Sequence, residues 1–309
     1  MKIRCFRSTQ KELKSICFLV IILAVMSLLS FVSGCGVTVA PQDSITTAAN
    51  PSASGSDKLR VSYIDVGQGD SILIQIPNGK NVLIDAGDND QGEKVVSYLN
   101  KQGVKRLDVA IWTHPHADHI GGADTVTKAF EIGQVVMPKQ TSTTESYRSL
   151  IKAISQKGLK ITEAKAGVIL DLGPEVKAEL LAPSSGSYEE VNNYSAVLRL
   201  TYGNTTFLFT GDAQSESEKE MIKTGQDLKA DVLKVGHHGS LTSTTSAFLN
   251  KVQPKYAVIS VGKDNDYGHP AESIITRLNK AGVNIYRTDE SGTLVFESDG
   301  KDITLIEGR

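Results

Sequence analysis

The sequence predicts an α/β fold in which two β-sheets are packed face to face and helices cover both outer faces, a four-layer αββα sandwich. The chain is 40% hydrophobic and 22% charged, which is typical of a globular protein with a sizeable core. From residue 59 onward, strand-like and helix-like segments alternate. Polar clusters fall where the expected strands end, which is where α/β proteins usually place their chemistry. We therefore expect one domain over residues 59–309.

The first 34 residues predict a lipoprotein signal peptide. A basic stretch precedes Cys17–Val32, 16 mostly apolar residues that are short for a membrane span and typical of a signal sequence. The segment that follows ends in Gly34-Cys35 and is similar to the bacterial lipobox, so Cys35 is the expected lipidation site. An uncleaved membrane anchor is the alternative. Cys35 would be the only cysteine left after cleavage, which excludes a disulfide within the mature chain.

Residues 35–58 have no aromatic residue and are rich in Ser, Thr, Ala and Pro, which predicts a flexible linker after the lipidated cysteine. We expect an exported protein on the outer face of the bacterial cytoplasmic membrane, attached to it through the lipid anchor only. The first 34 residues hold five of the 33 Lys and Arg and one of the 35 Asp and Glu, which leaves 28 basic and 34 acidic residues, a net charge of −6. This charge allows only weak, non-specific contact with nucleic acid, and no protein partner is identifiable.

The first half of the body alternates between apolar strands and amphipathic helices. Residues 59–67 and 71–77 are expected to form a strand pair around a glycine turn, and residues 81–87 a third strand. Apolar residues at helical spacing, closed by Gly103, predict a helix over 93–103. The expected segments that follow are an apolar strand at 106–114 with Trp112 in the core, a helix at 119–130, a strand at 135–138 and a helix at 146–158.

The second half begins with four strands and ends with a meander. Apolar runs between turn residues predict strands at 168–173, 176–183, 195–203 and 205–212. Helices at 215–225, 246–253 and 271–282 are expected to alternate with strands at 231–238 and 256–262, before a meander of strands over 284–308. Lys219, Lys223, Lys229 and Lys234 are expected on a solvated helix face rather than in a nucleic-acid groove.

The motif THPHADHIGG, residues 113–122, contains three of the six histidines of the chain. All six lie at or near the end of an expected strand, next to glycine or proline: His114, His116, His119, His237, His238 and His269. His114 and His116 can point to one side of an extended loop, while Asp118 and His119 can face a second point on the turn that follows. The cluster therefore predicts two metal ions about 3.5–4 Å apart, which need roughly seven protein ligands including a bridge.

The remaining ligands are expected in later loops. Asp212 ends an apolar strand and is the candidate bridge, with an N-cap for the next helix as its alternative role. His269 and one of His237 and His238 complete the set. Because these two histidines are expected on a strand, where adjacent side chains point opposite ways, the sequence leaves the choice between them open. Histidine and aspartate ligands without cysteine suit two divalent ions, zinc or manganese.

This pattern resembles the metallo-β-lactamase superfamily, whose HxHxDH signature matches residues 114–119. Further motifs occur in the same order in the C-terminal domain of ComEC competence proteins and in related secreted hydrolases such as the pneumococcal-type phosphorylcholine esterase. These motifs are DVGQGDS (65–71), TGD (210–212), HHGS (237–240) and GHP (268–270). The resemblance covers about residues 59–308, and Asp65 and Asp70 are expected to shape a turn rather than to bind metal.

The resemblance implies a ligand set with one departure. β-Lactamases carry a third histidine before the bridging aspartate, whereas residues 192–200 contain none, which argues against antibiotic hydrolysis. The implied assignment is His114, His116 and His238 to one ion, Asp118, His119 and His269 to the other, and Asp212 to both. Asp118 and His237 would be catalytic, with His237 as a proton donor or phosphate contact, and Asp85 would brace the ligand loop.

Three hydroxyl residues follow the HHGS motif. Ser240, Thr242 and Ser243 lie at an expected helix N-terminus, where they would bind the substrate phosphate or simply cap the helix. Together these features predict an exported, lipid-anchored hydrolase with two metal ions that acts on phosphodiesters, and the ComEC resemblance favours DNA or RNA. The alternatives are a cell-envelope phosphodiesterase for choline or teichoic-acid groups, and a non-catalytic surface binding lipoprotein, which a complete ligand set argues against.

Overall fold

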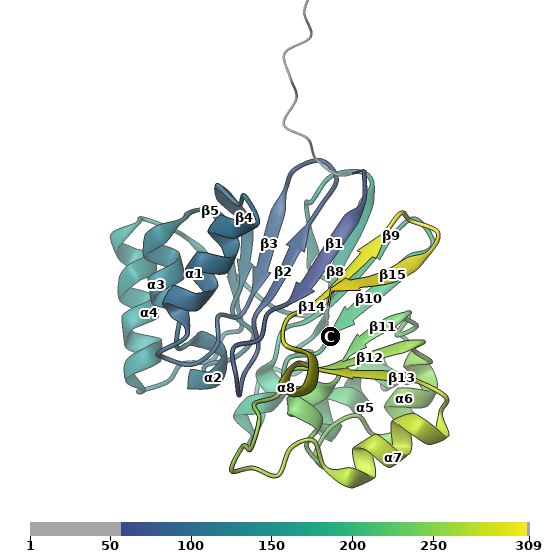
Figure 1. Cartoon of the computed structure of the whole chain (residues 1–309). Coiled ribbons are helices and arrows are strands. Elements are labelled where there is room, and N and C mark those ends of the chain that lie inside the picture. The colour runs from purple at the N-terminus through teal and green to yellow at the C-terminus, as the bar shows by residue number, and fades with distance from the viewer. Residues whose placement is uncertain (1–56, 308–309) are drawn as a thin grey trace, which may run out of the picture. The chain divides into compact units, whose positions relative to one another are not determined.

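Two β-sheets lie face to face between two layers of helices in the computed structural model, which describes residues 57–307 (Figure 1). The outer face of the first sheet is covered by α1 (Gly92–Lys101), α3 (Ala123–Ala129) and α4 (Glu145–Gln156), and that of the second by α5 (Ser215–Lys223), α6 (Ser246–Val252) and α7 (Glu272–Lys280). The predicted four-layer αββα sandwich is confirmed. The expected signal peptide at 1–34, the lipidation site Cys35 and the linker up to residue 56 lie outside the described residues.

Among the described residues the first sheet has eight strands and the second has seven. In spatial order the first sheet comprises β15 (Ile303–Glu307), β14 (Leu294–Ser298), β1 (Leu59–Tyr63), β2 (Ile72–Gln75), β3 (Asn81–Ile84), β4 (Arg106–Ile111), β5 (Glu131–Met137) and β6 (Ile161–Glu163). The second comprises β13 (Asn284–Arg287), β12 (Tyr256–Ile259), β11 (Val232–Lys234), β10 (Thr205–Phe209), β9 (Val197–Tyr202), β8 (Val176–Ala182) and β7 (Ile169–Leu170). Short helical turns are α2 (Ala117–Ile120), η1 (Val191–Tyr194), η2 (Gly236–Gly239) and α8 (Thr288–Ser291).

Each sheet is parallel on one side and antiparallel on the other. β3 to β6 run parallel in the first sheet, and β10 to β13 run parallel in the second. The carboxyl ends of neighbouring parallel strands meet at one edge of a sheet, where α/β proteins place their sites. The loops after β3, β4, β10, β11 and β12 therefore gather the sequence motifs, and contacts between them join the two sheets.

Alternation along the strands divides the core into an inner and two outer parts. In β10, Phe207 and Phe209 face the opposite sheet, while Leu208 between them packs under the helices. Tyr63 of β1 contacts Phe209 with ring centroids 6.2 Å apart and Phe296 of β14 at 6.0 Å. Burial of each such side chain contributes roughly 1.5–3 kcal/mol. This apolar interior holds the strand ends, and hence the loops, in fixed positions.

The structure differs from one expectation that bears on the site. The strand expected at 231–238 ends at Lys234, and His237 and His238 form a turn in which both have positive φ, 48° and 52°. The expectation that they lie on a strand is wrong, because the glycines on either side let the backbone leave the extended conformation there. The rule that adjacent side chains point opposite ways does not apply to this pair.

Three further elements differ from expectation. The helix expected at 119–130 is divided into α2 and α3 at Gly121-Gly122, where a Cβ on Gly121 would lie 2.3 Å from the backbone nitrogen of Asn89. Neither the edge strand β6 nor the helix α8 was expected, and α8 interrupts the meander at 284–308. Trp112 is fully buried, as predicted. Within residues 57–307 the helices are too short or too polar to cross a membrane.

Candidate metal centre

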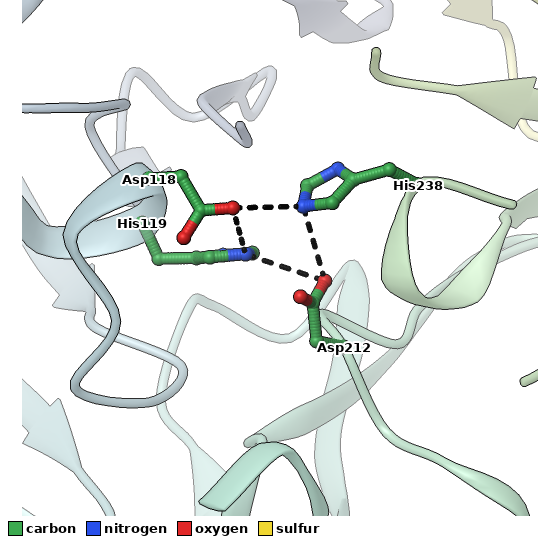
Figure 2. Close-up of side chains that lie close together, drawn as sticks. All are labelled: Asp118, His119, Asp212 and His238. Atoms are coloured by element: carbon green, nitrogen blue, oxygen red, sulfur yellow. Dashed lines mark hydrogen bonds and ion pairs between the residues drawn. The ribbon is translucent and has the colours of Figure 1, made fainter. Parts of the chain in front are cut away.

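Four side chains from three loops converge on one point. Figure 2 shows Asp118 and His119, which follow β4, turned toward Asp212, which follows β10, and His238, which follows β11. Asp118 Oδ2 lies 3.2 Å from His238 Nε2. Asp212 Oδ1 lies 3.3 Å from His119 Nε2 and 3.5 Å from His238 Nε2. One ligand atom from each of the four lies within 4.8 Å of the others, so the group joins the facing edges of the two sheets.

Two atoms of this group are buried without a hydrogen-bond partner among the described residues: His119 Nε2 and Asp212 Oδ1. They lie 3.3 Å apart as an ion pair but form no hydrogen bond, and a buried polar atom without a hydrogen bond costs about 1–3 kcal/mol. A nitrogen and a carboxylate oxygen aimed at the same enclosed point therefore fit a cation. Imidazole and carboxylate donors are the ligands of zinc and are also accepted by manganese. The residues present fit a divalent metal ion.

The second carboxylate oxygen of Asp212 faces a different set of histidines. His237 Nε2 lies 3.7 Å and His114 Nε2 lies 3.9 Å from Asp212 Oδ2. His116 adjoins this set, because its Nδ1 lies 3.1 Å from His114 Nε2. Asp212 thus stands between two groups of ring nitrogens, with one oxygen directed toward each group.

Hydrogen bonds on the far side of the rings orient His119 and His238. His119 Nδ1 lies 2.7 Å from Asp85 Oδ2, and His238 Nδ1 lies 2.9 Å from the carbonyl oxygen of Ser260. A carboxylate and a carbonyl can only accept, so each Nδ1 carries a proton and, in the neutral ring, each Nε2 presents its lone pair to the centre. Partners of this kind fix the tautomer and orientation of metal-binding histidines.

Hydroxyl groups hold the rings of His114 and His237, which face the second carboxylate oxygen of Asp212, in the same way. Thr113 Oγ1 donates to Asp85 Oδ2 at 2.6 Å and lies 3.1 Å from His114 Nδ1, from which it accepts. Thr242 Oγ1 lies 3.0 Å from His237 Nδ1. Asp85 also accepts the backbone N–H of Thr113 at 2.8 Å. Asp85 is therefore in contact with the loop that the resemblance expects it to brace.

A buried ion pair that the sequence analysis missed lies behind two of the rings. The side chains of Lys234 and Asp70 are 0% and 1% exposed, with Lys234 Nζ 2.8 Å from Asp70 Oδ2. Asp70 Oδ1 lies 3.5 Å from His238 Nδ1, and Asp70 Oδ2 lies 4.0 Å from His119 Nδ1. The expectation that Lys234 belongs to a solvated helix face is wrong, because it ends β11, an inner strand of its sheet. A lysine inside an apolar strand directly before the HHGS motif was the available signal.

The loop that carries Asp70 packs against the ligand loop. The backbone N–H of Asp70 donates to the carbonyl of Asp118 at 3.1 Å. A Cβ on Gly69, whose φ is 134°, would lie 2.2 Å from that same carbonyl oxygen, so this close approach requires glycine. Asp65 Oδ1 accepts from the N–H of Gly67 at 3.0 Å. These are turn-shaping contacts of the kind expected for both aspartates.

The electrostatics of the centre favours positive charge. Burial lowers the pKa of His238, but the carboxylates of Asp212 and Asp118 outweigh burial and raise this pKa to about 10. The pKa of His119 is raised for the same reason. Burial opposes ionisation of Asp212, yet His238 and His119 hold its pKa well below the usual range. The carboxylates thus keep protons on rings where a cation can replace them.

His269 lies beside this group rather than within it. Its ring centroid is 5.5 Å from that of His237 and 6.4 Å from that of His238. Burial and these two neighbouring rings lower the pKa of His269 to about 4. The expected assignment grouped Asp118 and His119 with His269, whereas in the structure His238 takes that place.

The hydroxyls expected to bind phosphate lie on a loop and not at a helix end. α6 begins at Ser246 with Thr245 as its N-cap, so the placement of Ser240, Thr242 and Ser243 at a helix N-terminus is wrong. A run of Ser and Thr offers several cap candidates, and only the last one is used. Ser243 Oγ instead donates to a backbone carbonyl at 2.9 Å. Thr242 Oγ1 lies 3.1 Å from Ser240 Oγ and holds a histidine ring as described above.

The centre opens into a cavity of about 460 Å³. Besides the candidate ligands, Gln68, Asp88, Asn192 and Tyr267 line it. Asn192 begins the stretch that lacks the lactamase histidine, and its Nδ2 lies 3.4 Å from His237 Nε2. The cavity gives a substrate access to both sides of the aspartate that stands between the two histidine groups.

The sandwich fold and this histidine–aspartate site define a class of protein. The family model of the metallo-beta-lactamase superfamily matches residues 64–263, and the chain belongs to that superfamily. This membership confirms the family that the motifs indicated.

The chain is also similar to proteins of the ComEC type. It is 35% identical over 258 residues to ComE operon protein 3 of Bacillus subtilis (strain 168), covering 78% of this chain and 33% of that protein. It is 34% identical over 248 residues to competence protein ComA of Neisseria gonorrhoeae, covering 80% and 33%. The chain thus spans about a third of the length of these relatives. Igni18, a novel metallo hydrolase from Ignicoccus hospitalis KIN4/I, shares the fold with a TM-score of 0.51 and 16% identity over 78% of this chain and 99% of that one.

Proposed function

We propose that this protein is an exported, lipid-anchored phosphodiesterase that uses two divalent metal ions and acts on DNA or RNA. Superfamily membership and the histidine–aspartate cluster support a metal-dependent hydrolase. The observation that carries the two-ion proposal is Asp212, whose two oxygens face separate groups of ring nitrogens. A non-catalytic binding role would need neither this aspartate nor the buried partners that orient the rings.

The geometry favours one distribution of ligands over the two ions. Asp118, His119 and His238 would hold one ion, His114, His116 and His237 the other, and Asp212 both. Each histidine of the HHGS motif thus serves a different ion, and His269 is left for contact with substrate. Zinc or manganese bound here would supply positive charge for the phosphate oxygens and lower the pKa of an attacking water.

The residues of the chain itself orient the metal-binding rings and contact the substrate. Asp85, Ser260 and Thr242 fix the ring tautomers, so that Nε2 faces the cavity without the cost of reorientation. The pKa of His269 is lowered to about 4, so its ring is neutral near pH 7 and can form a hydrogen bond with a substrate oxygen beside the centre. His119, Asp212 and His238 are buried, and removal from water strengthens the electrostatic contacts between them.

Nucleic acid is the favoured substrate because the relatives carry the names of competence proteins. Those names describe the relatives, and the activity of this chain is a proposal. The net charge of −6 over residues 35–309 implies weak binding to a polyanion that falls steeply with salt. A choline or teichoic-acid esterase would need to hold only one phosphate and would depend little on salt.

Initial rates against ionic strength test this proposal. The full-length protein in detergent, with added Zn²⁺ or Mn²⁺, is offered single-stranded DNA and the p-nitrophenyl ester of phosphocholine. We expect sequence-independent cleavage of DNA that requires added metal and decreases with salt. If only the small ester is hydrolysed, with little dependence on salt, the nuclease proposal is wrong and the esterase is favoured. If neither is hydrolysed with any metal, the phosphodiesterase proposal is wrong.

Attachment to the membrane is proposed through the lipid on Cys35. The substitution Cys35→Ala should release the protein from the membrane fraction or stop signal processing, because no thiol is then available for acylation. Cys17→Ala, within the apolar segment, is the matched control and should fractionate like the wild type. Wild-type fractionation and migration of Cys35→Ala would contradict lipid anchoring.

A further inference from the structure

One aromatic side chain stands exposed at the mouth of the metal centre. Tyr267 is 71% exposed and lines the cavity that contains Asp118, Asp212 and His238. The other large apolar side chains that are exposed within residues 57–307 do not line this cavity: Ile161, Ile169, Leu241 and Ile306. A large ring left in water beside a reaction centre offers apolar area that a bound ligand can cover.

The ring of Tyr267 has one occupied face and one open face. It stacks on the ring of His269 with centroids 5.7 Å apart and planes inclined by 20°. Because the side chain is nevertheless 71% exposed, the face opposite His269 is accessible. Tyr267 lines the same cavity as the candidate metal ligands.

The loop that carries the ring is held in place by Asn265. Asn265 Oδ1 accepts the backbone N–H of Tyr267 at 3.1 Å and that of His269 at 3.0 Å. Its Nδ2 donates to the carbonyl of His269 at 2.6 Å and to that of Gly262 at 3.0 Å. Because the backbone of the loop is already fixed, less conformational entropy is lost when a ligand covers the ring.

We infer that Tyr267 is a stacking platform for a nucleobase next to the phosphodiester that is cleaved, an inference that rests on the proposed phosphodiesterase function. A single open aromatic face fits a planar base and accepts any base, because every base has a π-face. A quaternary ammonium group is bound instead by a cage of several aromatic rings. Among the described residues that line the cavity, Tyr267 is the one Phe, Tyr or Trp.

Two oligomers of equal length test this inference: single-stranded DNA, and an oligomer with abasic tetrahydrofuran residues throughout. For Tyr267→Ala we expect KM for the DNA to rise about 5- to 150-fold, which corresponds to ~1–3 kcal/mol of stacking per base, while KM for the abasic oligomer stays within about twofold. Tyr267→Phe retains the ring and should behave like the wild type. Ile169→Ala, an exposed apolar residue away from the cavity, is the control.

Binding of the same labelled oligomers to the metal-free protein, measured by fluorescence anisotropy, separates this inference from the proposed function. If both oligomers are cleaved and Tyr267→Ala raises KM equally for both, or for neither, the platform is wrong while the proposed function stands. A Tyr267-dependent preference for base-bearing DNA without cleavage supports the platform and overturns the function. A loss confined to the phosphocholine ester shows that the ring recognises a cation, and the inference is then wrong. If the protein shows no preference for base-bearing DNA and cleaves neither oligomer, both the platform and the proposed function are wrong.

Discussion

His237 and His238 approach the same aspartate from two sides although they are neighbours in the chain. Both residues have positive φ, which costs about 1–3 kcal/mol for a residue other than glycine. The hydrogen bonds from His238 Nδ1 to Ser260 and from His237 Nδ1 to Thr242 hold the pair in this conformation. Two consecutive side chains can therefore face Asp212, one toward each of its carboxylate oxygens.

The shared aspartate gives the sharpest test at this scale. Asp212→Ala should lose at least one metal ion per chain and nearly all turnover, because its two oxygens face both groups of rings. Loss of a residue that only supports a ligand typically costs about 10–100-fold, so a larger loss is expected here. Metal content by mass spectrometry and turnover of the substrate are measured, with the exposed Asp302→Ala as control. Full metal content and activity in Asp212→Ala would refute the shared-ligand assignment.

The residue types of the site could be predicted from the sequence, but their grouping could not. All six histidines lie at or near strand ends together with Asp118 and Asp212, and such a concentration indicates a metal site, so the candidate ligands were identifiable. Which ring lies beside Asp118 depends on backbone angles at His237 and His238, and these are set by contacts with other loops. Lys234 was placed incorrectly on a solvated face, and Asp70 was given only a turn-shaping role. Their ion pair could not be predicted because it joins residues 164 positions apart in the chain.

At the scale of elements, the buried pair of Lys234 and Asp70 connects β11 of one sheet with the loop between β1 and β2 of the other. Lys234→Met should destabilise the fold by about 3–5 kcal/mol, because it leaves the Asp70 charge buried without its partner. It should also weaken metal binding about 10–100-fold, since Asp70 lies behind His119 and His238. Chemical denaturation and metal titration measure the two effects.

Two variants separate a lost charge pair from a lost side chain. Lys229→Met removes an exposed lysine from the same region and should leave stability and metal affinity near wild type. The double variant Asp70→Asn/Lys234→Met should be more stable than the sum of the single changes, because no uncompensated charge remains. Additive losses in the double variant would show that the two side chains act independently.

The pair of Arg60 on β1 and Glu297 on β14 predicts a dependence of stability on pH. Arg60 Nη2 lies 2.8 Å from Glu297 Oε1, and this hydrogen bond lowers the pKa of Glu297. A lowered carboxyl pKa contributes stability above the unfolded value of about 4.3, and this contribution is lost as pH falls through the folded pKa. Glu297→Gln should therefore cost about 0.5–1 kcal/mol at pH 7 and much less at about pH 3. An equal cost at both pH values, measured by urea unfolding, would contradict this origin.

The pattern of the sequence predicted the layers because apolar alternation is strong in strands such as β10, where Phe207 and Phe209 face the other sheet. It failed where tertiary contacts decide the element. β6 is a three-residue edge strand with partly exposed residues and little apolar signal. β11 ends at Lys234 because the chain turns toward the site there, although the apolar run continues to Val235.

At the scale of the whole molecule, the candidate ligands belong to loops of both sheets. A metal ion bound by Asp118 and His119 on one side and Asp212 and His238 on the other would stabilise the folded chain only. At free metal about 100 times Kd, one site should add ~2.7 kcal/mol to the free energy of unfolding. Thermal unfolding with Zn²⁺ or Mn²⁺ and with a chelator measures this effect. Asp212→Ala should respond weakly, and an equal Tm shift in that variant would show that the ions bind elsewhere.

The separation of His114 and His238 in the sequence also determines when the metal centre can assemble. The centre cannot assemble until both ends of this 125-residue interval are present in one compartment. If the chain crosses a membrane unfolded, the compartment in which it finishes folding supplies the ion, whatever the cytoplasm contains. Sites built from nitrogen and oxygen ligands discriminate poorly between such ions by affinity alone, so that local supply decides. For an exported chain, the physiological metal would then be set by the compartment in which its second half folds.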